Sequence, residues 1–147
     1  MTELSATPTP TRFPVDIPAR VRSAVEAADG RKALEIRVLH LGAVTSFTEY
    51  FILATGTSER QTQAISDAIE ERLRNEGVRP LSIEGQQRGQ WVLLDYGDFL
   101  VHVFTTERRS FYGLEKLWGD APDATREFLP IAPTPAAQQP APTQQGG

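Results

Sequence analysis

The sequence predicts an α/β protein with a five-stranded mixed sheet and helices packed on it. Three observations lead to this fold class. Segments with helical periodicity alternate with apolar strand-like runs, one such run leads through a Gly-containing turn into a capped helix, and two later runs lie close enough to form a hairpin. Together they predict the order α-β-β-α-β-β-β-α, in which the helices bury at least one face of the sheet.

The chain of 147 residues is expected to contain one domain, residues 16–128, between two disordered tails. Residues 1–15 are rich in Thr and Pro, and residues 129–147 contain no charged side chain. Neither segment has periodic apolar residues, so neither can bury enough apolar surface to offset the loss of chain entropy.

The amino-acid composition excludes several classes of protein. The chain has no cysteine, which rules out a disulfide framework and a thiolate metal site. No stretch approaches the roughly 20 apolar residues that span a bilayer, and the first residues lack a secretory signal, so a cytoplasmic location is expected. The formal charge is −4 without a block of Lys or Arg, whereas proteins that hold nucleic acid through its phosphates are normally basic. Little direct nucleic-acid binding is therefore expected.

A first helix is predicted after Asp16, whose carboxylate can cap it, with Pro18 in the first turn, where a missing N–H costs nothing. Apolar residues recur on one face of this segment, and Asp29-Gly30 ends it. Residues 34–41 alternate as a strand does. Residues 50–55 are continuously apolar, which is typical of a central strand covered on both faces.

Residues 56–58 turn the chain into a second predicted helix, which Gly77 ends. Ser58 with Gln61 matches a capping box. The buried stripe of this helix is expected at Ile65, Ala68, Ile69 and Leu73. Residues 81–84 form a short strand after it, so residues 50–84 read as a β-α-β unit with parallel strands and a right-handed crossover.

Residues 90–95 and 99–105 are predicted to pair as an antiparallel hairpin around Tyr96-Gly97-Asp98. An aromatic-rich helix follows, interrupted by Gly113 at a cost of about 1 kcal/mol relative to Ala. The core stripe of that helix is expected at Phe111, Leu114 and Trp118.

Residues 55–59 are one candidate for a phosphate-binding site. Here a predicted strand leads into a helix N-terminus, where backbone N–H groups and the positive end of the helix dipole can bind an anion. A P-loop would need Gly-Lys-Ser/Thr, and a dinucleotide site would need three spaced glycines. Neither pattern is present, so the segment is interpreted as an ordinary capped turn.

Three carboxylates and two histidines are the candidates for catalytic groups. Glu84, Asp95 and Asp98 could hold Mg²⁺ for nucleotidyl transfer, but such enzymes use alternate positions of one strand, and Asp95 and Asp98 are three apart across a turn. A turn role is favoured, with Asp98 binding nearby backbone N–H groups. His40 and His102 lie in predicted strands. The sequence has neither a Gly-x-Ser-x-Gly nucleophile elbow nor a His-Glu-x-x-His zinc motif, so both histidines are interpreted as structural residues of the sheet. No catalytic residue, metal ligand or cofactor is predicted.

Trp91 is the leading candidate for a binding anchor. Alternation places Trp91, Leu93 and Asp95 on one face of a strand and Val92 on the other. If helices cover only the face of the sheet that carries Val92, Trp91 lies on an exposed face. An equally weighted alternative is that Trp91 packs in the hydrophobic core. Arg109 on the last predicted helix could add a polar contact to an interface.

Six segments keep a common order and spacing over about a hundred residues, namely 45–51, 54–61, 83–85, 91–98, 101–104 and 109–118. Together they resemble the ribosomal silencing factor family, also called RsfS or Iojap-related proteins. Two positions depart from the family pattern. His40 stands where the family usually has Asp, and Glu49 replaces the usual Asp before Tyr50.

The resemblance implies a homodimeric protein that binds the large ribosomal subunit through ribosomal protein fourteen, blocks subunit association and represses translation under nutrient limitation. It also implies a nucleotidyltransferase-like fold without the catalytic carboxylates. Mapped onto this sequence, the expected partner-binding residues are Pro80, Glu84, Trp91, Leu93 and Asp95. Trp91 would be the buried anchor, and the two acids would pair with donors on a basic ribosomal protein. The rival reading is a metal-dependent nucleotidyltransferase-like enzyme that would use Thr57-Ser58 for phosphate.

Overall fold

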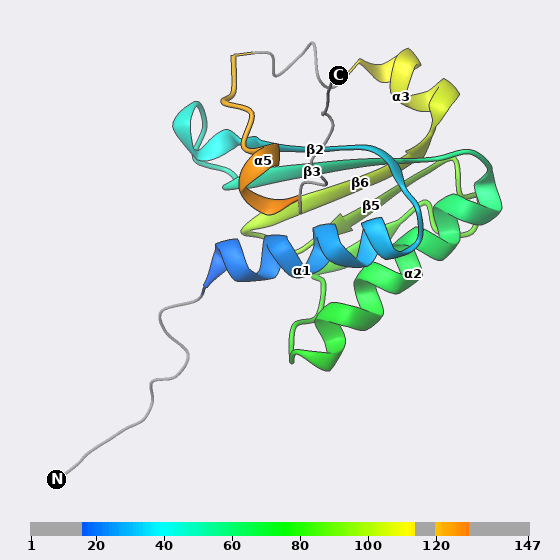
Figure 1. Ribbon diagram of the computed structural model, residues 1–147, viewed down its shortest axis with the longest axis horizontal. Coiled ribbons are helices and arrows are strands. Elements are labelled where there is room, and N and C mark those ends of the chain that lie inside the picture. The colour runs from blue at the N-terminus through cyan, green and yellow to red at the C-terminus, as the bar shows by residue number, and fades with distance from the viewer. Residues whose placement is uncertain (1–15, 114–119, 130–147) are drawn as a thin grey trace, which may run out of the picture.

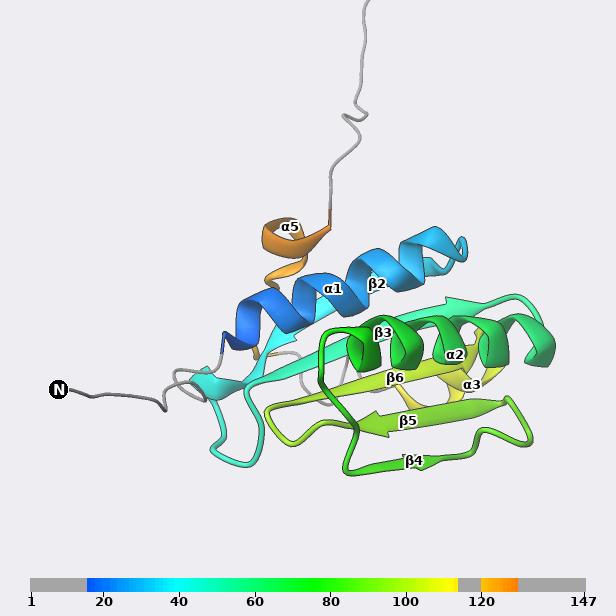
Figure 2. The same cartoon turned by 90° about the horizontal axis from the view of Figure 1, so that it is seen from below.

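The computed structural model describes residues 16–113 and 120–129, which form a five-stranded mixed sheet with two long helices side by side on one face (Figures 1 and 2). The elements are α1 (Ile17–Gly30), β2 (Leu34–His40), the 3₁₀ helix η2 (Leu41–Ala43), β3 (Tyr50–Gly56), α2 (Glu59–Asn75), β4 (Ser82–Glu84), β5 (Trp91–Asp95), β6 (Phe99–Thr105), α3 (Thr106–Tyr112) and α5 (Thr125–Phe128). The mixed α/β class predicted from the sequence is confirmed. The short helices η2 and α5 were not predicted. The two predicted tails lie outside the described residues except for Leu129, which is partly buried against the main core.

The strands lie in the order β2-β3-β6-β5-β4. Among the described strands, only β3 and β6 pair in parallel, over their full lengths, and the other three pairs are antiparallel. It follows that β3 and β4 run in the same direction, as the β-α-β reading predicts, but β6 and β5 lie between them. The connection through α2 therefore crosses two strands to reach the edge of the sheet.

Both long helices begin at the predicted caps. The Asp16 carboxylate accepts from the backbone N–H of Ala19 at 3.0 Å, and the Ser58 hydroxyl accepts from that of Gln61 at 3.1 Å. The second half of the predicted capping box is wrong by one residue. The Gln61 side chain accepts from the N–H of Thr57 at 2.7 Å and not from that of Ser58, and its amide group donates to the Arg31 carbonyl at 3.2 Å.

The main core lies between the two helices and one face of the sheet. In the predicted stripe of α2, Ile65, Ile69 and Leu73 are fully buried and Ala68 is partly buried. They pack with fully buried side chains of α1 and the strands, among them Val21, Val25, Ile52, Val92, Leu94, Val101 and Val103. These contacts commit one face of every central strand to the core.

The last predicted helix is shorter than its aromatic stripe implied. Gly113 adopts the left-handed conformation, with φ 59° and ψ 39°, and its N–H donates to the Arg109 carbonyl at 3.1 Å. Gly113 therefore caps α3 and does not interrupt it. Leu114 and Trp118 lie outside the described residues.

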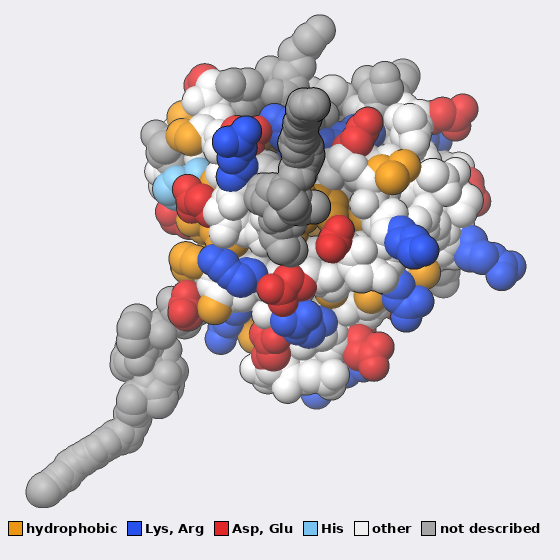
Figure 3. Space-filling view, in the orientation of Figure 1, with side chains coloured by type: hydrophobic (Ala, Val, Ile, Leu, Met, Phe, Trp, Pro, Cys, Tyr) orange, Lys and Arg blue, Asp and Glu red, His pale blue; other side chains and the backbone are white. Residues whose placement is uncertain are grey.

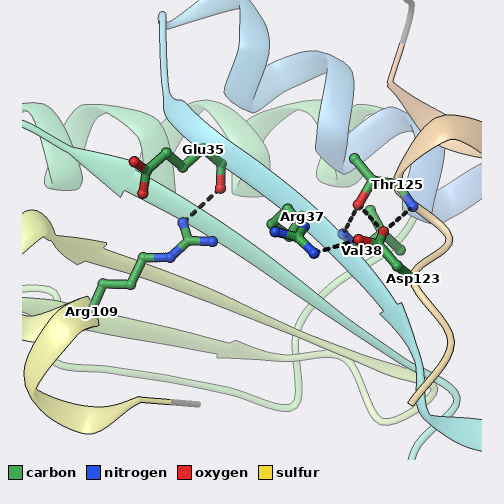
Figure 4. A network of polar contacts seen from close by, with 6 residues as sticks. All are labelled: Glu35, Arg37, Val38, Arg109, Asp123 and Thr125. Atoms are coloured by element: carbon green, nitrogen blue, oxygen red, sulfur yellow. Dashed lines mark hydrogen bonds and ion pairs between the residues drawn. The ribbon is translucent and has the colours of Figure 1, made fainter. Parts of the chain in front are cut away.

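The two edges of the sheet differ. The segment after residue 120 covers β2, where the Ala124 N–H donates to the Val38 carbonyl. The Val38 N–H donates to the Thr125 hydroxyl, and Asp123 forms an ion pair with Arg37 (Figure 4). At the opposite edge, β4 has no second strand neighbour among the described residues. The β4 edge therefore remains accessible, with Ile83 40% exposed.

Candidate functional site

Strand register brings most of the predicted partner-binding residues onto one face of the sheet. Trp91, Leu93 and Asp95 alternate along β5 with the core residues Val92 and Leu94, so they point away from α1 and α2. Glu84 of β4 pairs with Leu93 and therefore lies on the same side. We call this surface the Trp91 face. Its residues are Glu84, Trp91, Leu93, Asp95, Leu100 and His102.

Pro80 is the one predicted residue outside these strands. It is half-buried on the connection that leads from α2 to β4. The next residue, Leu81, donates its backbone N–H to the Asp95 carbonyl at 2.6 Å. Pro80 therefore lies at the border of the Trp91 face, near its Asp95 end.

Trp91 is half-buried and rests on a second apolar cluster, on the side of the sheet opposite the main core. Its ring lies 5.9 Å from the Phe104 ring and 5.8 Å from the His102 ring, and its indole N–H donates to Nδ1 of His102 at 3.1 Å. The cluster consists of Leu39, Leu41, Phe51, Leu53, Phe104 and Ala121. Both alternatives predicted for Trp91 are therefore partly correct, because the ring packs on a buried apolar cluster and part of it stays accessible to solvent.

His102 has a larger role than the sequence indicated. Because the indole N–H of Trp91 can only donate, Nδ1 of His102 accepts and the ring proton sits on Nε2. Nε2 is buried and has no hydrogen-bond partner among the described residues, so the interpretation of His102 as a satisfied sheet histidine holds for only one of its two ring nitrogens. Burial lowers the pKa of His102 to about 4, which keeps the ring neutral under Trp91.

The pKa of His102 predicts a stability loss in acid. Between pH 6.5 and pH 4 the unfolded chain binds a proton at His102 that the folded chain does not, so the free energy of unfolding falls as the pH is lowered. The shift from 6.5 to about 4 corresponds to about 3 kcal/mol, fully present above pH 6.5. Urea unfolding across this range measures the loss. It should be smaller in His102→Gln, and an unchanged slope in this variant would contradict the assignment.

Asp95, and not Asp98, holds the turn of the β5–β6 hairpin. The Asp95 carboxylate accepts from the Gly97 N–H at 2.8 Å, and the Asp98 backbone N–H donates to the Tyr96 carbonyl. The sequence reading assigned the side-chain role to Asp98 and is wrong here. An Asp that precedes a turn reaches the N–H two residues on, as Asp95 does.

Glu84, Asp95 and Asp98, the carboxylates considered for metal-dependent catalysis, do not form a three-residue metal site. Within the described residues, no group of three His, Cys, Asp or Glu side chains is placed to hold a metal ion. At the turn considered for phosphate, the Thr57 N–H donates to the Gln61 side chain and the Gln61 N–H donates to Ser58. These contacts are those of a capped turn.

Arg109 does not reach the surface as an interface residue. It is 6% exposed, and its guanidinium donates to the Glu35 carbonyl at 2.6 Å (Figure 4). The same guanidinium donates to the Thr55 hydroxyl at 2.7 Å. Glu35 has a positive φ of 48° at an irregularity in the pairing of β2 with β3, which turns its carbonyl toward Arg109. Arg109 therefore anchors α3 to the sheet.

The two positions that depart from the resembled family pattern contact each other. Nε2 of His40 lies 2.9 Å from a carboxylate oxygen of Glu49, and the His40 ring stacks on Tyr50 with 4.8 Å between centroids. The pair closes the loop between β2 and β3. Sequence spacing alone did not indicate this contact.

Surface charge on the view of Figure 3 is mixed. Lys and Arg side chains alternate with Asp and Glu, and no extended basic patch is visible among the described residues on that side. Such a surface is typical of a solvated face and offers no long track for a nucleic-acid backbone.

Comparisons with known proteins agree on one family. The family model described as "Ribosomal silencing factor during starvation" matches residues 14–146. A Bacillus subtilis protein named ribosomal silencing factor RsfS is 39% identical over 108 residues, which cover 74% of this chain and 92% of that protein. The chloroplastic protein Iojap of Zea mays is 37% identical over 67% of this chain and 43% of its own length. A crystal structure of a Chromobacterium violaceum protein superposes with a TM-score of 0.70 at 36% identity, covering 71% of this chain and 88% of that one.

Proposed function

The chain belongs to the family of ribosomal silencing factors, and from that membership we propose that it binds the large ribosomal subunit and keeps the small subunit from joining. The proposed contact on the large subunit is ribosomal protein fourteen. By occupying a surface that the small subunit needs, the factor represses translation when nutrients are limited.

The Trp91 face is the observation that supports this proposal. It has the half-buried aromatic ring of Trp91 at one end of β5, the partly buried Leu93 next along the strand, and the carboxylates of Glu84 and Asp95 beside and beyond Leu93. Protein interfaces commonly have this arrangement, with an aromatic anchor surrounded by polar groups that set orientation. Acidic marginal groups are complementary to a basic ribosomal protein.

Occlusion of this kind requires no chemical step. The rival function, metal-dependent nucleotidyl transfer, needs two carboxylates directed at one ion. Glu84 pairs with Leu93, whereas Asp95 pairs with Ser82 and uses a carboxylate oxygen to hold its turn. A non-enzymatic role fits this geometry better. The nucleotidyltransferase-like ancestry of the fold stays a prediction.

A homodimeric state in the absence of ribosomes and a cytoplasmic location complete the proposal. In the parts of the chain that the structure describes, none of the helices is long and apolar enough to cross a membrane.

Cosedimentation with purified ribosomal particles tests the proposal. The factor is expected to sediment with isolated large subunits, and not with small subunits or with joined ribosomes, because the proposed surface is covered after joining. Added before joining, it should inhibit translation, and a higher concentration of small subunits should relieve the inhibition by mass action. Equal binding to all three particles, or inhibition that accumulates with time as catalytic turnover does, would exclude occlusion.

A further inference from the structure

A hollow of about 230 Å³ lies beside the Trp91 face, between the β4–β5 loop and the start of α3. Among the described residues, the side chains that line it are two arginines, one amide and one aromatic ring, and none of these is a carboxylate. The lining residues are Gly85, Arg88, Gln90, Trp91 and Arg108. At about 30 Å³ per water, the volume suffices for a phosphate group with some of its hydration shell.

The loop that presents Arg88 is held in place on both sides. Gly85 has φ +82°, and a Cβ atom there would lie 2.0 Å from the Trp91 carbonyl oxygen, so only glycine lets the loop pass this close to β5. On the other side, the amide of Gln63 on α2 donates to the carbonyls of Gln86 and Gln87, each at 2.9 Å. The backbone at Arg88 is therefore positioned before any ligand arrives.

The two guanidinium groups are placed differently. Nη2 of Arg108 donates to the Gln90 side chain at 2.7 Å, and Gln90 in turn donates to Glu59 at 3.1 Å, so this chain of hydrogen bonds positions Arg108 at the hollow. Arg88 is exposed and forms no hydrogen bond or ion pair with a described residue. Its charge is available to a ligand.

We propose that this hollow binds a phosphate group of RNA next to the surface that the Trp91 face docks on. The planar fork of a guanidinium matches phosphate oxygens, and Trp91 offers the edge of an aromatic platform on which a base can stack. This inference rests on the proposed function, because Trp91 belongs both to the Trp91 face and to the hollow. When the Trp91 face docks on the large subunit, a phosphate in the hollow belongs to the same large-subunit surface.

The surroundings limit the contact to one or two phosphates. The adjoining hollow, which shares Gln90 and Arg108, is also lined by Glu59 and Glu107. These carboxylates would repel a continuing phosphate backbone. A local contact of this kind is compatible with the overall charge of −4 and differs from the extended binding of a basic protein.

Direct binding can be measured without ribosomes by NMR of the full chain. Titration with a short single-stranded RNA should shift the Arg88 backbone N–H and the Trp91 indole N–H, and Arg88→Ala should weaken this binding about tenfold, the loss of one charged hydrogen-bonding group. The matched control is Arg79→Ala, an exposed arginine on the connection before β4. It should bind as the wild type does.

Parallel titrations identify the source of the anion. Inorganic phosphate and a nucleoside monophosphate should bind more weakly than RNA, because neither combines stacking with a second phosphate. Tighter binding of the mononucleotide would make the hollow a soluble-ligand site, and tighter binding of an oligoglutamate peptide would make it a site for acidic protein. Either result, or no shift at Arg88 with RNA up to millimolar concentration, would overturn the proposal.

Binding to large subunits at several salt concentrations separates this inference from the function itself. Arg88→Ala should lower the affinity and make the plot of log K against log salt less steep by about 0.7–0.9, the contribution of one phosphate contact. If both arginine variants bind large subunits as the wild type does, with the same slope, the phosphate site fails although the proposed function stands. If the wild type does not bind subunits, the function fails and the NMR titration still tests the hollow.

Discussion

Trp91→Ala is expected to weaken binding to the large ribosomal subunit by about 30- to 1000-fold, the 2–4 kcal/mol typical of an aromatic hot spot. The indole is half-buried on the second apolar cluster and donates a hydrogen bond to His102, so its orientation is set before a partner arrives. Truncation removes both the apolar contact area and this preorganisation. Cosedimentation over a concentration series measures the affinity.

The control for this variant is Phe47→Ala, which removes another exposed aromatic, 56% accessible, from the loop between β2 and β3. It should bind large subunits as the wild type does. Urea unfolding of Trp91→Ala should show a smaller loss of stability than the 3–5 kcal/mol typical of a fully buried tryptophan. If Trp91→Ala leaves the chain unfolded, Trp91 belongs to the core and the Trp91 face is wrongly assigned.

Ile69→Ala is expected to lower the free energy of unfolding by about 2–5 kcal/mol, the range for removing a buried aliphatic side chain. Ile69 is fully buried on α2, between α1 and the sheet. The variant leaves every residue of the Trp91 face in place, so the affinity of the folded fraction for large subunits should not change. The urea midpoint, compared with the wild type at one pH, measures the effect.

The matched control for Ile69→Ala is Glu71→Ala, an exposed position on the same helix. It should change stability by no more than about 0.5 kcal/mol. A loss below about 1 kcal/mol for Ile69→Ala would mean that α2 does not dock as described. Together, the Trp91 and Ile69 variants separate binding from folding, because each should affect one property much more than the other.

The features that the sequence determined by itself depend on neighbouring residues. Asp16 and Ser58 cap their helices because a cap needs only a side-chain acceptor beside the first turn. The stripe with Ile65, Ile69 and Leu73 follows from helical period, and the separation of Trp91 from Val92 follows from strand alternation. For this reason Trp91, Leu93 and Asp95 share one face, whereas Glu84 joins them only through the pairing of β4 with β5.

Only the tertiary structure decided which strands became neighbours. Parallel pairing of β3 with β6 joins segments more than forty residues apart, and no local pattern specifies it. That pairing places His102 beside Leu53, and the β5–β6 hairpin adds Leu93 on the other side of His102. A lone histidine in a strand gave no indication that it would receive the indole hydrogen bond of Trp91.

The same reason explains the misassigned polar residues. Arg109 is buried because Glu35, distant in sequence, turns a backbone carbonyl toward it. Arg88 and Arg108 form one hollow because the β4–β5 loop packs against α2 beside the start of α3. Local periodicity determined the elements and the faces of this protein. Long-range pairing decided which polar groups meet, because those contacts exist only after the chain has closed on itself.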